Sequence, residues 1–181
     1  IPSLPKLIAC FISEKLQPDS VTLSIVPPFT GCLKIFHSAT TTFIAPSDPS
    51  RIGSMQHEHI HAIPLWHQGP AWYDCIFMSM DNMREGMLSM DVAQVHCFFS
   101  LIHTNGQMFQ CALVHWFDHI ADEPDELTGI WMVAPSFLED GSPHHAVIHI
   151  DSIIHSMHLL LIFGSGYISP YVNCHNSLEV F

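Results

Sequence analysis

Two long runs of β-branched and aromatic residues, Val92–Ile102 and Met108–Ile120, flank the dipeptide Asn105-Gly106. Asn-Gly between two such runs is the strongest short-range signal for a β-hairpin, because both residues tolerate the left-handed backbone of a tight turn. An isolated hairpin is marginally stable in water and needs further strands or a helix to cover it. The chain is therefore expected to fold around a β-sheet.

Shorter runs of the same kind surround this hairpin and are separated by turn signals such as Asp140-Gly141. They are Trp72–Met78, Ile130–Val133, Ala146–Ile150 and a last strand that ends at Phe163. Short strands at this spacing are typical of a small barrel or sandwich. We therefore expect a mainly β (α+β) fold, with an SH3-like or related small β-barrel over residues 70–165.

The residues before the barrel follow other patterns. Apolar residues recur at helical spacing from Ser3 to Leu16, so residues 1–31 are expected to form a helix and a proline-rich linker. Residues 32–69 contain two short strand-like runs, Leu33–His37 and Thr41–Ile44, and a polar stretch rich in proline that we expect to be irregular.

The two ends of the chain suggest a fragment of a longer protein. The first residue is Ile1 rather than Met, and Phe181 ends the chain inside an apolar pattern. Residues 166–181 are expected to form a C-terminal segment in which a helix starts near Asn176.

Charge limits the partners that this chain can bind. Five Lys and Arg residues face seventeen Asp and Glu residues, which gives a formal net charge of -12. Phosphates are repelled by such a chain, so direct nucleic-acid binding is disfavoured and a basic partner is favoured. No apolar run is long enough to cross a membrane. The six cysteines are isolated from one another, which favours a reducing, intracellular compartment.

Histidine is unusually frequent, with fifteen residues. His57, His59 and His61 alternate, so a strand would place their imidazoles on one face, and three histidines with a water can hold zinc. A zinc-dependent hydrolase is therefore one hypothesis. The other interpretation is that the histidines are scattered over unrelated surfaces, since their spacing matches no closed four-ligand pattern. On this second interpretation, which we favour, no cofactor and no metal are expected.

Motifs for catalysis are missing from the sequence. It contains neither the G-x-S-x-G nucleophile elbow nor a glycine-rich loop that binds phosphates. Neighbouring Cys and His residues, such as His96 and Cys97, are expected by chance in a chain with this many histidines. We therefore expect no catalytic residues and no enzyme activity.

Aromatic residues in or beside the predicted strands suggest a binding role. Small barrels can present a few of them as a cage that holds methylated lysine through cation–π attraction, and the candidates are Tyr73, Phe99, Trp116 and Trp131. An acidic rim would attract a basic peptide. The alternative is that these side chains belong to the core of the barrel. A reader module for a basic or methylated peptide is thus a second hypothesis.

Several short strings of residues resemble one protein family when they are taken together. They are His37-Ser-Ala, Ala45-Pro-Ser-Asp, Tyr73-Asp-Cys-Ile-Phe, Asp91-Val-Ala, Cys111-Ala-Leu-Val-His-Trp-Phe, Asp122-Glu-Pro-Asp-Glu, Thr128-Gly-Ile-Trp, and Ile148-His-Ile-Asp-Ser-Ile before His158-Leu. The set, spread over residues 4–181, resembles the C-terminal region of the Plavaka-type transposases of basidiomycete fungi, which are cut-and-paste DNA transposons.

This resemblance implies a non-catalytic accessory domain of a transposase-like protein. Its role would be to engage target DNA or chromatin, or to assemble the complex, with the rest of the transposase and a chromatin protein as partners in the nucleus. The acidic nuclease triad of the family is expected upstream, so no catalytic residue is carried over.

A non-functional, decayed copy is a further hypothesis. It rests on positions where the family tends to show Arg, and single transitions in Arg codons would produce the residues found here: His57, His61, His67, Gln68, Trp72, Gln94, His119 and His155.

Overall fold

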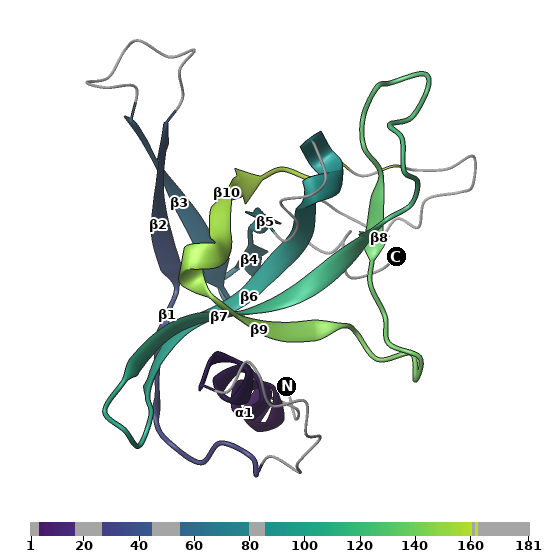
Figure 1. Ribbon diagram of the computed structural model, residues 1–181. Coiled ribbons are helices and arrows are strands. Elements are labelled where there is room, and N and C mark those ends of the chain that lie inside the picture. Colours follow the sequence, from purple (N-terminus) through teal and green to yellow (C-terminus); the bar gives the residue numbers. More distant parts are fainter. Residues whose placement is uncertain (1–3, 17–26, 45–54, 80–85, 161, 163–181) are drawn as a thin grey trace.

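The computed structural model describes residues 4–16, 27–44, 55–79, 86–160 and 162 (Figure 1). Within these ranges, the helix α1 (Leu4–Leu16) precedes the strands, and the 3₁₀ helices η2 (Gly86–Ser89) and η3 (Ile150–Ser152) lie among them. The strands are β1 (Leu33–Phe36), β2 (Ser38–Ile44), β3 (Met55–Ile63), β4 (Trp72–Tyr73), β5 (Cys75–Ser79), β6 (Met90–Ile102), β7 (Met108–His119), β8 (Val133–Pro135), β9 (His145–His149) and β10 (Ile153–Met157). The prediction of a mainly β fold with an N-terminal helix is confirmed.

The predicted hairpin is formed by β6 and β7, which pair from Val92 opposite Phe117 to Ile102 opposite Met108. The backbone N–H of Gly106 donates to the carbonyl of His103 at 2.8 Å, and His103 N–H donates to the carbonyl of Gln107 at 2.8 Å. Gly106 has a φ of 85°, as expected for the left-handed last position of a three-residue hairpin loop. The Asn-Gly signal therefore located the hairpin, whereas its loop is one residue longer than the tightest class.

The main sheet has the order β10-β5-β6-β7-β8, with β1 added beside β6 and β9 beside β7. From β9 the chain passes through η3 directly into β10, which pairs with β5 on the far side of β6. Figure 1 shows this bend between β9 and β10. The small barrel that the sequence predicts takes the form of open antiparallel sheets curled around one core.

This core lies on the inner face of the curled sheet. Ile76, Val95 and Val114 are fully buried there, and they come from β5, β6 and β7. Ile60 and Ala62 of β3 pack on the same cluster. The smaller sheet β2-β3-β4 therefore covers the open side of the barrel, because burying these apolar side chains is the main favourable term in folding.

Helix α1 covers part of the outer face of the same sheet. Its residues Ile8, Phe11 and Ile12 recur at helical spacing, so that they form one apolar face, and this face packs on Phe99 and Phe109 of β6 and β7. The rings of Phe11 and Phe109 meet edge to face, with centroids 5.9 Å apart. In Figure 1 the helix lies below the β6–β7–β9 part of the sheet.

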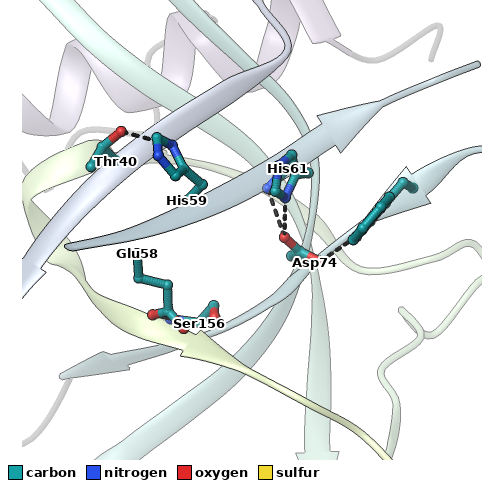
Figure 2. A network of polar contacts seen from close by, with 7 residues as sticks. Thr40, Glu58, His59, His61, Asp74 and Ser156 are labelled. Carbon is teal, nitrogen blue, oxygen red and sulfur yellow. Dashed lines mark hydrogen bonds and ion pairs between the residues drawn. The ribbon is translucent and has the colours of Figure 1, made fainter. Parts of the chain in front are cut away.

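Strand β3 corrects one prediction. Its residues lie in the stretch that we expected to be irregular, yet they pair with β2 over seven positions, from Ser38 opposite His61 to Ile44 opposite Met55. The sequence did not indicate this strand because the outward positions of β3 are mostly histidine, which is not among the residue types enriched in strands. Glu58 of β3 links the β2–β3 pair to the main sheet. Its Oε2 atom accepts the Ser156 N–H of β10 at 2.9 Å (Figure 2).

Two further expectations differ from the structure or lie outside it. The predicted strand Trp72–Met78 is divided at Asp74 into β4 and β5, which belong to different sheets. The expected C-terminal segment, residues 166–181, lies outside the described residues, and with it the expected helix start near Asn176. Within the ranges described, no helix has the length and apolarity needed to cross a membrane.

Candidate functional site

Asp74 lies at the point where the chain leaves the small sheet and enters the main sheet. Its backbone N–H donates to the carbonyl of His61 at 3.0 Å, and its carbonyl accepts the N–H of Val95 at 2.9 Å. Asp74 is therefore bonded through its backbone to β3 on one side and to β6 on the other. This double pairing explains why the predicted long strand divides here.

The carboxylate of Asp74 holds two aromatic side chains. Its Oδ2 atom accepts the backbone N–H of His61 at 2.7 Å and lies 3.0 Å from His61 Nδ1, as Figure 2 shows. Its Oδ1 atom accepts the indole N–H of Trp72 at 2.7 Å. The side chain is only 16% exposed. Because the carboxylate is nearly buried and all of these bonds are short, it orients the imidazole and the indole rigidly.

Trp66 joins these rings and completes what we call the indole cluster, made of His61, Trp66 and Trp72. The two indole centroids are 4.9 Å apart with planes at 80°, and the His61 ring lies 4.9 Å from Trp72 and 6.2 Å from Trp66. Trp66 is 38% exposed and Trp72 is 41% exposed. Large aromatic side chains gathered at a surface in this way are typical of binding sites.

The turn that carries Trp66 has a strained backbone. His67 and Gln68 have φ values of 47° and 63°, and the Gly69 N–H donates to the carbonyl of Trp66 at 2.7 Å. These values indicate a type I′ turn, for which Asn and Gly are strongly preferred over residues with larger side chains. Left-handed residues of this kind cluster at ligand-binding sites. The strained turn therefore adds a second reason to regard the indole cluster as functional.

The charges around the indole cluster favour a cation. The stretch 55–73 contains no Lys or Arg. The lysines of the described residues, Lys6, Lys15 and Lys34, lie on α1 and β1. A basic ligand at the indole cluster would therefore meet the Asp74 carboxylate and the overall charge of -12 without a lysine or arginine on the strands that form the site.

The three alternating histidines share one face of β3, as the sequence predicts, but each has its own partner. Nδ1 of His57 lies 2.9 Å from Thr42 Oγ1, and Nδ1 of His59 lies 3.2 Å from Thr40 Oγ1. His61 is bound to Asp74. Positions four residues apart on a strand are separated by roughly 13 Å, so His57 and His61 cannot both bind one zinc ion at about 2 Å. The geometry gives the zinc hydrolase hypothesis no support.

The four aromatic residues chosen from the sequence do not come together. Phe99 is 2% exposed under α1, and Tyr73 and Trp116 pack against the inner core. Trp131 lies beside His119, with ring centroids 5.7 Å apart. The positions of Phe99, Tyr73 and Trp116 fit the alternative of core aromatics, whereas Trp131 belongs to none of the core clusters that the described residues form. The exposed indoles are Trp66 and Trp72, and strand alternation next to Tyr73 was the signal that could have identified Trp72.

A second group of histidines lies elsewhere on the barrel and was not singled out by the sequence. His96, His115 and His145 come from β6, β7 and β9, and their ring centroids are 5.2 to 6.2 Å apart. Burial, together with the neighbouring His145 and His115, lowers the pKa of His96 to about 4. Burial also lowers the pKa of His145. Burial therefore favours the neutral form of His96 and His145.

No family model, curated protein or solved structure matches this chain.

Proposed function

We propose that this chain is a non-catalytic interaction module of a transposase-like protein and that its indole cluster binds a basic peptide of a partner protein. The observation that carries the proposal is the exposed Trp66–Trp72 pair, held in place by Asp74. The transposase-like parent is supported by the resemblance of the residue strings described above. The role in the parent would be to engage chromatin or to assemble the complex.

Cation–π attraction is the physical basis for peptide binding. An ammonium or guanidinium group within about 6 Å of an indole face gains about 0.5–2 kcal/mol, and more when water is excluded. The exposed parts of two indoles at right angles can contact one such side chain together. Because the indole N–H of Trp72 is already bonded to Asp74, the ring cannot turn away from this position. A lysine, methylated lysine or arginine side chain is therefore the ligand that this surface fits best.

Peptide titration tests this proposal directly. A lysine-rich peptide and its trimethylated form would be titrated into the purified chain by calorimetry, followed by the Trp66→Ala and Trp72→Ala variants. Trp131→Ala is the matched control, since it removes an indole outside the indole cluster. We expect saturable binding that weakens at least about tenfold in both variants and stays unchanged in the control, in line with the loss of about 1.4 kcal/mol.

Two outcomes would contradict peptide binding at the indole cluster. One is no saturation at millimolar peptide, and the other is an equal loss of affinity in Trp66→Ala, Trp72→Ala and Trp131→Ala. The part of the proposal that concerns the parent protein has its own test. The genomic DNA upstream of this coding region should contain an open frame with an acidic nuclease triad, flanked by terminal inverted repeats. Stop codons in that region would contradict an active transposase.

Sister copies of the gene would separate a functional surface from a decayed one. His67, Gln68 and Trp72 lie at positions where the family tends to show Arg, and they lie in or beside the indole cluster. Sister copies that also encode Trp at position 72 would support a functional surface. Arg codons there would show that the surface arose by decay of this copy.

A further inference from the structure

We propose that His96, His115 and His145 together form a site for a divalent transition-metal ion of the zinc type. These residues are distinct from the alternating histidines of β3, and the inference does not depend on peptide binding by the indole cluster. The three side chains come from neighbouring strands of the main sheet, in the order β6, β7 and β9. His115 and His145 lie directly opposite each other in the register.

A β-bulge brings the third histidine into the group. The register between β6 and β7 shifts between Val95 and Cys97, so that His96 has no partner of its own on β7. A bulge of this kind changes the direction of the side chain that it carries, and such bulges often lie next to functional sites. The His96 ring is thereby placed 5.5 Å from that of His145, two strands away.

The spacing of the rings suits one ion. Their centroids are 5.2 Å apart for His115 and His145, 5.5 Å for His96 and His145, and 6.2 Å for His96 and His115. Three imidazoles that bind a tetrahedral ion through nitrogens about 2 Å from it have centroids roughly 5 Å apart. The observed separations are therefore within about 1 Å of those that a bound ion requires.

Two of the rings have features that suit metal binding: His115 is held by a hydrogen bond, and His96 has a buried nitrogen that is unpaired within the described part of the chain. The Nε2 atom of His115 lies 2.9 Å from the carbonyl oxygen of Ser136, which can only accept, so Nε2 carries the proton and Nδ1 keeps a free lone pair. A bond of this kind from the second ring nitrogen to a carbonyl is the usual support of a metal-binding histidine. The Nε2 atom of His96 is buried without a hydrogen-bond partner among the described residues. Such a buried atom gains most from a ligand.

The three side chains reach a metal-binding arrangement only when an ion binds. In the described ranges no three His, Cys, Asp or Glu side chains already surround an ion position, so the three rings are neighbours whose donor atoms do not yet converge. Rotation of the His96 and His145 rings about χ2, a broad torsion, can aim their donors toward His115 without moving the strands, while His115 keeps its bond to Ser136. Water would supply the fourth ligand.

Cobalt titration tests the site, because tetrahedral cobalt bound to histidine absorbs visible light. The purified chain would be stripped with a chelator and titrated with Co²⁺, and zinc would then be added to displace it. We expect one ion per chain, displacement by one equivalent of zinc, and a rise in Tm with zinc. His115→Gln and His145→Gln should each weaken binding at least about tenfold.

The matched control is the double variant His57→Gln and His59→Gln, which removes two histidines of the exposed face of β3. Binding that stays intact in the control and weakens in the His115 and His145 variants supports the site. Circular dichroism confirms that each variant is folded. Two results would overturn the inference: no saturable cobalt signal in the folded chain, or a signal that is lost in the control and kept in His115→Gln.

Discussion

The Oδ2 atom of Asp74 is bonded to both the backbone and the ring of His61, at 2.7 Å and 3.0 Å. His61 belongs to the small sheet, whereas Asp74 leads into the main sheet, so this pair joins the two parts of the structure. The same carboxylate positions Trp72. Stability and the proposed binding surface therefore depend on one side chain.

Replacement of Asp74 by Ala is expected to lower the free energy of unfolding by about 1–3 kcal/mol, since a buried backbone N–H and an indole N–H lose their acceptor. Denaturant unfolding measures this change. The matched control is Asp151→Ala, which removes the carboxylate of an exposed pair 3.4 Å from His149 Nδ1. Exposed pairs contribute about 0–1 kcal/mol. Equal effects of the two variants would contradict the joining role of Asp74.

The turn between β3 and β4 predicts a stabilising substitution. Gln68 has a φ of 63°, which glycine adopts without steric strain. Gln68→Gly is expected to raise the free energy of unfolding by about 0.5–1 kcal/mol, because strain at a left-handed residue costs about 1–3 kcal/mol and glycine adds entropy to the unfolded chain. The midpoint of urea unfolding measures the gain. The reverse change, Gly106→Ala at a φ of 85°, should destabilise the chain. A loss of stability in Gln68→Gly would show that the turn is not strained.

The packing of α1 on the main sheet predicts a large loss of stability when one buried aromatic side chain is removed. Phe99 is 2% exposed, and Phe99→Ala is expected to lower the free energy of unfolding by about 3–5 kcal/mol through lost burial and the cavity that remains. The control is Ile35→Ala. Ile35 lies opposite Phe99 in the register of β1 and β6 but is 50% exposed. The Ile35→Ala variant should lose less than about 1 kcal/mol of its free energy of unfolding. Thermal unfolding compares the two, and similar losses would contradict the packing of α1 on this face.

His96 predicts a dependence of stability on pH in the metal-free chain. Burial lowers its pKa from 6.5 to about 4, so the folded state binds this proton less readily than the unfolded state. The contribution of neutral His96 to the free energy of unfolding is therefore fully present above about pH 6.5. It decreases by about 3 kcal/mol in total as the pH falls toward about 4, and it does not change further below that pH. Urea unfolding between pH 7 and pH 4 with a chelator present measures the slope. His96→Phe, which keeps a ring but cannot titrate, should flatten the curve. An unchanged slope in this variant would assign the dependence to other groups.

The sequence by itself predicted the elements that depend on local patterns. The helix follows from apolar residues at helical spacing between Leu4 and Leu16, and the β6–β7 hairpin follows from Asn105-Gly106 between two strand-like runs. Both signals act over a few residues, so no distant contact is needed to interpret them. The alternation of His57, His59 and His61 would put them on one face of a strand, but the sequence predicted an irregular segment there, and the structure showed the strand.

Only the tertiary structure decided which side chains meet. The indole cluster combines β3, β4 and a left-handed turn, and its position depends on the division of a strand at Asp74. The His96, His115 and His145 group depends on the register of three strands and on one bulge. A shift of one residue in a register moves every side chain to the other face, and that register is set by the burial of the whole core rather than by neighbouring residues. For this reason the sequence determined the elements, and the packing of the sheets determined both candidate sites.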